Sequence, residues 1–319
     1  MGNVLVINQE IFKDLVTQEE AIQIVESAFT QLHENKSIVF PAVRQLIEEH
    51  NGIFGIKSSY LIDEKSVGLK AGGFWKGNGS RGKANHQSTM LLLDPETGEP
   101  MCLLDANHLT SLRTGAAGAV AAKYLARSVS KTVTLIGAGL QARSQLSALL
   151  QMFPIEEVVV FSQTEVSSRK LAEEIGQKGI AARYTDCPQK AVEQADIVVT
   201  TTPSFSPVIK SSWLREGTHV NAMGSDTKGK RELEIDRAFD IVVCDLWEQS
   251  TSMGELQNAE PETPYLEIGQ LTSKEKPGRQ SAHEITLFDS TGVAVQDLSV
   301  ALHVYRRAKE LGVGVTVEL

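Results

Sequence analysis

The residues with the clearest chemical meaning are Gly-Ala-Gly-Leu-Gln-Ala at 137–142, which directly follow the apolar run 133–136. A G-x-G-x-x-A turn between a strand and a helix is typical of dinucleotide binding. Gly137 permits the tight bend, Gly139 lets the backbone approach a pyrophosphate, and Ala142 allows the helix to pack closely on the sheet. Because a helix N-terminus attracts negative charge, this turn predicts NAD(H) or NADP(H) as the cofactor. The predicted contacts within the turn are Gly137, Ala138, Gly139, Leu140 and Gln141.

The second apolar run, 158–161, leaves open which of the two dinucleotides binds. It ends at Ser162, Gln163 and Thr164, where an NAD enzyme usually carries an Asp or Glu that binds the ribose hydroxyls. The two hydroxyl side chains could instead hydrogen-bond a 2′-phosphate, with charge supplied by the basic pair 169–170. That pair does not stand directly after the strand, so both NAD and NADP are kept.

Asp226 is the candidate acid or base. It follows the apolar run 219–222 and a glycine, Gly224. Ligands of open parallel sheets bind beyond the carboxyl ends of the strands, so we expect Asp226 to lie beside the cofactor. A carboxylate there could hydrogen-bond a substrate amine, or handle its proton, while hydride moves between Cα and the nicotinamide ring. The alternative is an aspartate that caps its own loop.

Composition and charge disfavour several other classes of protein. The 319 residues exceed what one compact core usually holds, so we expect two domains. A net charge of −9 disfavours nucleic acid and anionic membranes as partners. The three cysteines form no C-x-x-C and the histidines show no ligand spacing, so no metal is predicted. The apolar run 4–7 is too short for a signal peptide, and we therefore expect a cytoplasmic protein.

The elements that must position these residues differ between the two parts of the chain. Thr17-Gln18-Glu19-Glu20 has the form of a capping box and precedes apolar residues at helical spacing, which predicts a helix. From 39 to 105 the apolar runs are short or alternating and are broken by Gly, Asn and Pro, which predicts a mostly antiparallel sheet. Residues 109–127, rich in Ala and Leu, predict a closely packed helix that leads out of this region.

After that helix, apolar strands alternate with helical stretches as far as residue 289. Such alternation predicts a parallel sheet with helices on both faces. The fold class is therefore α/β, a Rossmann doubly wound parallel sheet beside a separate α+β region. The predicted strands of the parallel sheet are 133–136, 158–161, 197–200, 219–222, 241–244 and 285–288.

Four motifs in a fixed order extend the argument to the whole chain. They are Leu-Arg-Thr-Gly-Ala-Ala at 112–117, the turn at 137–142, Gly-Ser-Asp at 224–226 followed by Gly-Lys-Arg-Glu-Leu at 229–233, and Asp-Ser-Thr-Gly at 289–292. In this order they resemble the ornithine cyclodeaminase/mu-crystallin family. That family includes ornithine cyclodeaminases, archaeal-type alanine dehydrogenases, ketimine and pyrroline-carboxylate reductases, an iminosuccinate reductase and mu-crystallin. The resemblance therefore indicates the cofactor class more closely than the substrate.

The resemblance also implies how the chain is divided. It implies a substrate-binding and dimerisation domain from residues 1–120 and 294–319, and a Rossmann dinucleotide-binding domain at 121–293. A last helix around 294–311 would return to the first domain, and its apolar residues do fall at helical spacing. The active site would then lie in the cleft between domains. The implied partners are a small imino or amino acid and a second copy of the chain, in a homodimer.

The site residues implied by the resemblance are mainly basic. Arg113 matches the arginine that binds the substrate carboxylate, which a planar guanidinium can hold through two parallel hydrogen bonds. Lys70 matches the active-site lysine, which would hold the carboxylate or polarise the bond at Cα; with Arg113 and Asp226 it completes the predicted catalytic set. Arg44 falls where the family often has a basic residue. The further cofactor contacts carried over are Thr114, Ser162, Gln163, Thr164, Thr201, Thr202, Pro203, Met223, Gly224, Ser225, Lys230 and Ser290.

Residues 54–58, Phe-Gly-Ile-Lys-Ser, depart from the ornithine cyclodeaminases, which have a glutamate followed by Met-Pro there. That glutamate would suit a cationic amine, whereas Lys57 would repel one by ~4 kcal/mol at ~4 Å. The Gly-x-Lys pattern resembles the iminosuccinate reductase branch, and Arg44, Lys57, Lys70 and Arg113 together would suit a dicarboxylic imino acid. Residues 110–127 resemble the alanine dehydrogenases, but that likeness lies largely in a packing helix.

Our first hypothesis is thus an enzyme, an NAD(P)H-dependent imino-acid reductase or amino-acid dehydrogenase. Conversion of iminosuccinate to aspartate is favoured over conversion of pyruvate plus ammonia to alanine. The main alternative is an ornithine-type cyclodeaminase, an ammonia lyase that would oxidise and re-reduce its substrate on a bound NAD. A non-catalytic ligand binder of the mu-crystallin type is a third, although Lys70, Arg113 and Asp226 are all present.

Overall fold

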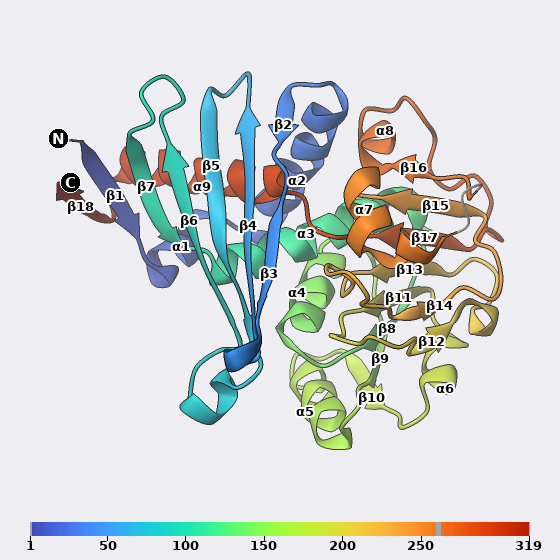
Figure 1. The fold of residues 1–319 in the computed structure, drawn as a ribbon. Coiled ribbons are helices and arrows are strands. Elements are labelled where there is room, and N and C mark those ends of the chain that lie inside the picture. The colour runs from blue at the N-terminus through green and yellow to red at the C-terminus, as the bar shows by residue number, and fades with distance from the viewer. Residues whose placement is uncertain (1, 260–262, 319) are drawn as a thin grey trace. The chain divides into compact units, whose positions relative to one another are not determined.

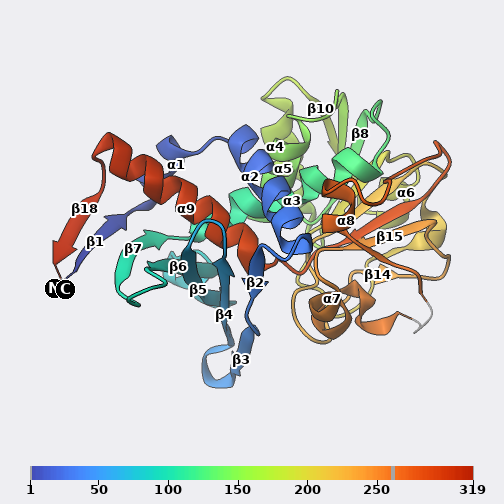
Figure 2. The same ribbon diagram turned by 90° about the horizontal axis from the view of Figure 1, so that it is seen from above.

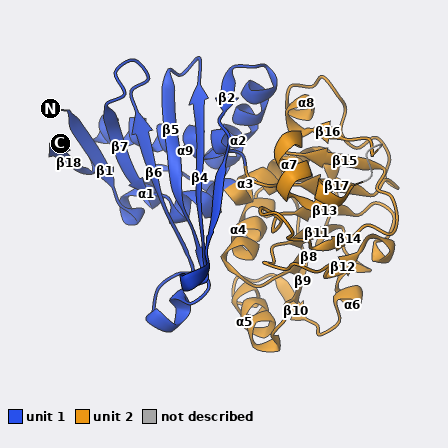
Figure 3. Ribbon diagram, in the orientation of Figure 1, with its two compact units in different colours: residues 1–113, 293–319 blue, residues 114–292 orange. Residues whose placement is uncertain are grey.

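The computed structural model describes residues 2–259 and 263–318, which fold into two compact units (Figure 1, Figure 3). Unit 1 comprises residues 1–113 and 293–319, and unit 2 comprises residues 114–292. The chain passes from one to the other within helix α3 (Asn107–Leu125) and returns just before helix α9 (Ala294–Leu311).

Unit 1 is built on one sheet in the order β18-β1-β7-β6-β5-β4-β2, with β3 also paired to β4. Among the described strands of this sheet, β1 and β7 run parallel and the other pairs are antiparallel, which confirms the prediction. The strands are β1 (Asn3–Ile7), β2 (Ser37–Val39), β3 (Val43–Ile47), β4 (Gly52–Leu61), β5 (Ser66–Trp75), β6 (His86–Leu93), β7 (Pro100–Asp105) and β18 (Val315–Glu318). Two short 3-10 helices, η1 (Glu48–His50) and η2 (Asn78–Arg81), lie in its loops.

Helices cover one face of this sheet. Figure 2 shows α1 (Gln9–Leu15), α2 (Gln18–His33) and α9 on the same side of the strands. α9 packs against β4 and β5. The predicted capping box begins α2 as expected, because the Glu20 N–H donates to Thr17 Oγ1 at 3.2 Å and the Thr17 N–H donates to Glu20 Oε2 at 2.8 Å.

The opposite face of the unit 1 sheet carries a row of apolar side chains. Register places them next to one another on five neighbouring strands: Leu69, Leu91, Leu103, Val6 and Val315. Leu103 is 39% exposed and Val315 is 61% exposed, whereas Cys102 and Leu104, which flank Leu103, are buried against the helices. We call this row the open face. The open face therefore leaves apolar side chains uncovered on the side of the sheet away from the helices.

Unit 2 is a parallel sheet in the order β10-β9-β8-β11-β13-β17-β15-β16. The chain starts inside the sheet at β8, moves outward to β9 and β10, and returns on the other side of β8 with β11, which is the doubly wound Rossmann arrangement. The six predicted strands are present, each within one residue at either end. The strands are β8 (Thr132–Ile136), β9 (Glu157–Phe161), β10 (Ala181–Tyr184), β11 (Ile197–Thr200), β13 (His219–Ala222), β15 (Ile241–Cys244), β16 (Leu266–Glu267) and β17 (Thr286–Asp289).

Short helices and a small extra ladder complete unit 2. The α-helices are α4 (Leu140–Leu149), α5 (Glu165–Gly176), α6 (Pro188–Val192), α7 (Trp247–Met253) and α8 (Ile268–Thr272). The 3-10 helices are η3 (Ser211–Trp213) and η4 (Glu255–Asn258), and β12 (Ile209–Lys210) pairs with β14 (Leu233–Glu234). Throughout the described residues, no helix combines the length and apolar character needed to span a bilayer.

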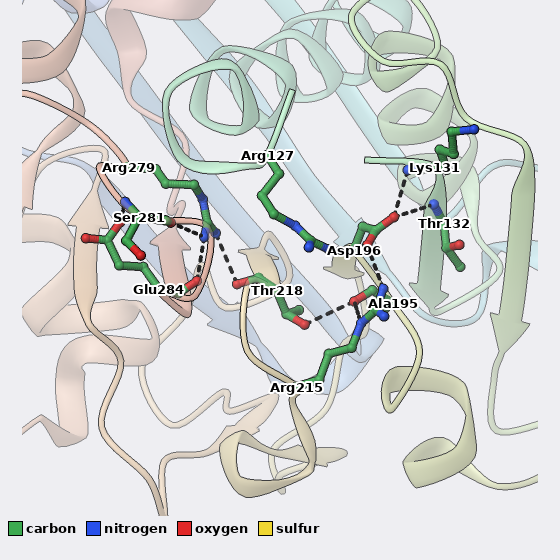
Figure 4. Close-up of polar contacts among 10 residues, drawn as sticks. All are labelled: Arg127, Lys131, Thr132, Ala195, Asp196, Arg215, Thr218, Arg279, Ser281 and Glu284. Carbon is green, nitrogen blue, oxygen red and sulfur yellow. Dashed lines mark hydrogen bonds and ion pairs between the residues drawn. The ribbon is translucent and has the colours of Figure 1, made fainter. Parts of the chain in front are cut away.

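At the amino-terminal edge of the unit 2 sheet, one carboxylate joins several elements (Figure 4). Asp196 Oδ2 accepts from the backbone N–H groups of Lys131 and Thr132 at 2.7 and 3.0 Å. Its Oδ1 forms ion pairs with Arg127 and, at 2.6 Å, with Arg215. These charges hold the starts of β8 and β11 together, at the edge opposite the one where Rossmann ligands bind.

Candidate active site

The glycine-rich turn has the geometry that dinucleotide binding requires. Gly137 has φ +113°, a conformation that favours glycine, and a Cβ there would lie 2.6 Å from Thr201 Oγ1. Gly139 is the N-cap of α4, and a Cβ placed on it would meet nothing within 4 Å. Ala142 is fully buried on the sheet side of the helix. The backbone at Gly139 is therefore open to a pyrophosphate, at the N-terminus of a helix of ten residues.

The hydroxyls that follow β9 are engaged in the turn that starts α5. Ser162 Oγ donates to the Thr164 carbonyl at 2.9 Å and lies 2.9 Å from Ser168 Oγ. Thr164 Oγ1 donates to Ser167 Oγ at 2.7 Å. These contacts fix the turn where a dinucleotide ribose is recognised in Rossmann folds, and Gln163 lies between the two hydroxyl residues.

A buried glutamate of the 229–233 motif, to which the sequence analysis assigned no role, links the loops beyond β11 and β13. Glu232 Oε2 accepts from Thr200 Oγ1 at 2.7 Å and from the Gly224 N–H at 2.8 Å, and Oε1 accepts from the Thr202 N–H. Burial raises the pKa of Glu232 to about 7, although its contacts with Thr200 and Thr202 lower it. The predicted cofactor positions Thr202 and Gly224 are thus tied to one carboxylate, and Thr201, Pro203 and Met223 adjoin them.

Two further predicted contacts, Ser225 and Ser290, point their hydroxyls into a second group of buried acids. Ser225 Oγ donates to Glu255 Oε1, which also accepts from the Glu232 N–H at 2.7 Å. Ser290 Oγ donates to Asp245 Oδ2 at 3.1 Å. Burial raises the pKa of Glu255. These serines therefore support the loops at the carboxyl edge with their side chains.

Asp226 lies beyond the end of β13, as expected for an acid or base at the carboxyl edge of the sheet. Its Oδ1 accepts from Lys230 Nζ at 2.7 Å, and Lys230 Nζ also donates to the Gly224 carbonyl at 3.3 Å. The Asp226 side chain is 31% exposed, so the pair remains accessible to a ligand. The structure thus brings together the candidate acid or base and a predicted cofactor contact.

In unit 1, Lys70 and Arg113 meet a carboxylate that sequence reasoning did not single out. Lys70 Nζ donates to Asp297 Oδ1 at 2.7 Å, and Arg113 Nε lies 3.0 Å from the same oxygen. Arg113 Nη1 also donates to Gln296 Oε1 at 2.8 Å. All four residues are buried. The signal in the sequence was a pair of polar residues, Gln296 and Asp297, inside the apolar stripe that predicted the last helix.

Lys57 and Arg44 stand on the same face of the sheet as Lys70. Lys57 is directly opposite Lys70 in the β4–β5 ladder, and Arg44 is opposite Gly55 in the β3–β4 ladder. Gly55 and Lys57 are two residues apart on one strand, so they share a face. A Cβ on Gly55 would lie 3.3 Å from Arg44 Nη1, so the glycine makes room for the guanidinium.

The electrostatic balance of this unit 1 cluster favours an anionic ligand. Burial lowers the pKa of Lys70 to about 7; Asp297 opposes the shift, and Arg113 and Lys57 add to it. Burial would raise the pKa of Asp297, but Arg113 and Lys70 more than offset it, and the net shift is downward. One carboxylate therefore faces several cationic side chains, and a carboxylate ligand would reduce the excess positive charge.

A model of the ornithine cyclodeaminase/mu-crystallin family matches residues 2–312. The chain is 39% identical over 318 residues to an alanine dehydrogenase of Archaeoglobus fulgidus, covering 97% of each. It is 36% identical over 323 residues to an iminosuccinate reductase of Paracoccus denitrificans, covering 99% of this chain and all of the other.

Solved structures resemble the fold over its whole length. An archaeal alanine dehydrogenase dimer with bound NAD has a TM-score of 0.93 at 38% identity and covers both chains fully. The iminosuccinate reductase of Paracoccus denitrificans in complex with NAD+ has a TM-score of 0.91 at 36% identity, again with full coverage of both. A Δ1-pyrroline-2-carboxylate reductase of Thermococcus litoralis with NADH and L-proline has a TM-score of 0.93 at 33% identity, covering 98% of this chain and all of the other.

Proposed function

Since the chain belongs to the ornithine cyclodeaminase/mu-crystallin family, we propose that it is an NAD(P)H-dependent imino-acid reductase that converts iminosuccinate to aspartate. The broader activity, hydride transfer at Cα of an imino or amino acid, is shared by the alanine dehydrogenase, iminosuccinate reductase and pyrroline-2-carboxylate reductase relatives. The choice of a dicarboxylic substrate within that activity rests on the basic cluster of unit 1.

The observation that carries this choice is Lys57 directly across the ladder from Lys70. Side chains opposite each other in an antiparallel ladder have Cβ atoms about 5 Å apart, so these two ammonium groups start from neighbouring positions on one face of the sheet. Lys70 and Arg113 suit the α-carboxylate, which leaves Lys57, with Arg44 nearby, for a second carboxylate. A cationic side chain such as that of ornithine would be repelled by Lys57, at a cost of ~4 kcal/mol if the two charges were ~4 Å apart.

Reduction of pyruvate plus ammonia to alanine is the second candidate, because an alanine dehydrogenase is 39% identical to the chain. Pyruvate carries one carboxylate, which Lys70 and Arg113 would satisfy. Lys57 would then have no role in binding the substrate. The two candidates therefore differ in whether Lys57 contributes to binding.

Unit 2 has the features that suit a nicotinamide dinucleotide. Gly139 and the start of α4 would hold its pyrophosphate, and the ends of β11 and β13, with Thr201 and Gly224, would line its nicotinamide half. The bound cofactor supplies the hydride. In the proposed reaction Lys70 and Arg113 orient the substrate carboxylate, and Asp226 holds or transfers the proton at the substrate nitrogen.

We further propose that the active form is a homodimer joined through the open face of unit 1. The row through Leu69, Leu91 and Leu103 presents apolar surface that a second copy would bury, and the alanine dehydrogenase neighbour is described as a dimer. Sedimentation of wild type and Leu91→Lys tests this: a dimer that L91K converts to monomer supports it, and a wild-type monomer contradicts it.

The described cysteines are free thiols, which suits the reducing cytoplasm we propose as the location of the protein.

The experiment that tests the activity is an absorbance assay at the nicotinamide band with NADH and NADPH separately. Oxaloacetate plus ammonia, pyruvate plus ammonia and a cyclic ketimine are offered as substrates. The strongest turnover is expected with oxaloacetate plus ammonia, and the assay also decides between NAD and NADP. Ornithine with ammonia detection is the control: ammonia release without net cofactor change would make the chain a cyclodeaminase.

A further inference from the structure

Asp297, in the first turn of α9, is the carboxylate on which the basic cluster of unit 1 converges. Its Oδ1 accepts from Lys70 Nζ at 2.7 Å and lies 3.0 Å from Arg113 Nε. The preceding residue, Gln296, accepts from Arg113 Nη1 at 2.8 Å. Two consecutive residues of one helix therefore contact the Lys70 ammonium and the rigid guanidinium of Arg113, which has a hydrogen bond at Nη1 and an ion-pair contact at Nε.

Asp297 is held in place by the packing of α9 on the sheet. α9 packs across β4 and β5, the strands that carry Lys57 and Lys70. Leu298, the residue after Asp297, would lie 2.9 Å from a Cβ on Gly68, so helix and strand are in close contact two residues from Lys70. A carboxylate in the first turn is also favoured by the helix dipole. The position of the carboxylate is thus fixed by the packing of α9 on the sheet.

Stability alone explains this cluster poorly. Burying two cations and a carboxylate costs solvation that their attraction often does not recover. Within the described part of the chain, Asp297 Oδ2, Gln296 Nε2 and Arg113 Nε are buried without a hydrogen-bond partner, which adds to the cost. Local rules of stability are usually broken where function requires it.

We propose that Asp297 is a positioning residue, which fixes Lys70 and Arg113 for the substrate carboxylate and keeps the Lys70 ammonium charged. The inference rests on the proposed function, because that function assigns Lys70 and Arg113 to the substrate. Burial lowers the pKa of Lys70 to about 7, and Asp297 is the group that opposes this shift. Without the Asp297 charge, Lys70 would lose its proton at a still lower pH, while Arg113 would lose the contact at Nε.

The test compares Asp297→Asn and Asp297→Glu with wild type in the full chain. kcat and KM are measured with oxaloacetate plus ammonia between pH 5.5 and 9. Binding of succinate, a dicarboxylate that cannot be reduced, is measured by calorimetry over the same range. Asp105→Asn is the control, since the Asp105 carboxylate accepts from its neighbour Asn107 at 3.0 Å and not from the cluster.

Loss of the Asp297 charge should act on binding in a pH-dependent way. D297N is expected to raise KM and weaken succinate binding at least tenfold at pH 8, with a smaller loss of kcat and partial recovery at pH 6. The basic limb of its binding profile should move about one unit lower, since one pKa unit corresponds to tenfold at fixed pH. D297E, which keeps the charge, should keep the limb, and D105N should keep both the limb and KM.

Three results would overturn the positioning role. The first is D297N with wild-type succinate affinity and pH dependence and only a lower melting temperature, as for a structural ion pair. The second is tighter succinate binding with an unmoved limb. If D297N does not fold, Gln296→Leu and D297E are the variants that test the role. Both should raise KM without moving the basic limb of the binding profile. The third overturning result would be wild-type KM values in both variants.

The two proposals fail in different ways. A wild-type chain that reduces no imino acid, yet binds succinate with a limb that D297N shifts, would refute the proposed function and keep the role of Asp297. A wild-type chain with the proposed activity, whose limb is the same in D297N, would refute the role of Asp297 alone.

Discussion

Replacing Lys57 with methionine should remove the preference for a dicarboxylic substrate while leaving the reaction itself intact. Methionine keeps much of the length and apolar volume of the lysine stem, so the β4–β5 ladder should be undisturbed. An ion pair at 4 Å is worth ~4 kcal/mol at an effective dielectric constant of about 20. Hydrogen bonds to charged groups contribute about 1.5–3 kcal/mol in measured series.

Because Lys57 is partly exposed to solvent, the lower part of this range applies. We expect a loss of about 2 kcal/mol, which is about 30-fold in kcat/KM for oxaloacetate plus ammonia. Pyruvate plus ammonia should change by less than about threefold, since its one carboxylate would be held by Lys70 and Arg113. The ratio of the two kcat/KM values, measured by NAD(P)H absorbance, therefore reports the specificity directly.

Lys65→Met is the matched control, because Lys65 is an exposed lysine in the turn between β4 and β5. K65M should leave both kcat/KM values at the wild-type level. If K57M lowers turnover of the two substrates equally, Lys57 supports the pocket as a whole and does not bind a second carboxylate. If K57M changes neither, the dicarboxylate assignment is wrong.

Three other outcomes are expected. Gly139→Ala should keep the melting temperature within a few degrees, because its Cβ meets only open space in the protein, but it should weaken NAD(P)H binding at least tenfold in a fluorescence titration, because the Cβ would enter the space for the pyrophosphate. Gly137→Ala should lose stability as well, because the alanine is forced to φ +113° and its Cβ lies against Thr201. With a pKa of about 7 for Lys70 before ligand binds, kcat/KM for carboxylate substrates should fall by up to about tenfold per pH unit above pH 7. Lys70→Arg should remove this limb of the pH–rate profile, because a guanidinium stays charged over this range. Burial lowers the pKa of His219 to about 3 from 6.5, so its contribution to stability is present above pH 6.5 and is lost as pH falls toward 3. The free energy of unfolding, measured with urea across this range, should therefore rise with pH about 1.4 kcal/mol per unit more steeply in wild type than in His219→Asn. Equal slopes would contradict a neutral buried histidine.

Local signals in the sequence predicted much of the fold. The capping box at Thr17 predicted the start of α2, because its two reciprocal hydrogen bonds involve residues only three apart. Six strands of the parallel sheet, β8, β9, β11, β13, β15 and β17, are largely buried and appear as continuous apolar runs, so their positions were predicted within one residue. The turn at Gly137 was recognisable because a positive φ and close packing demand small residues at fixed spacing.

Long-range pairings were not predictable in this way. β1 and β18 come from opposite ends of the chain and form neighbouring strands, a partnership that no local pattern encodes. β10 is mostly exposed and β16 has two residues, so neither has an apolar run to mark it. Their places depend on neighbouring strands that are distant in sequence.

The site residues show the same difference between local patterns and long-range contacts. The dinucleotide turn, the Arg–Thr–Gly–Ala helix and the aspartate after β13 were recognisable without coordinates, because each depends on residue types at short spacing. The convergence of Lys70 and Arg113 on one oxygen of Asp297 became visible only in the folded chain, because Arg113 and Asp297 are more than 180 residues apart in sequence. The contacts by which Glu232 joins the loops of β11 and β13 likewise became visible only there. Charge interactions act through space over a few ångströms, so the balance that sets the protonation of Lys70 exists only once α9 has packed on the sheet.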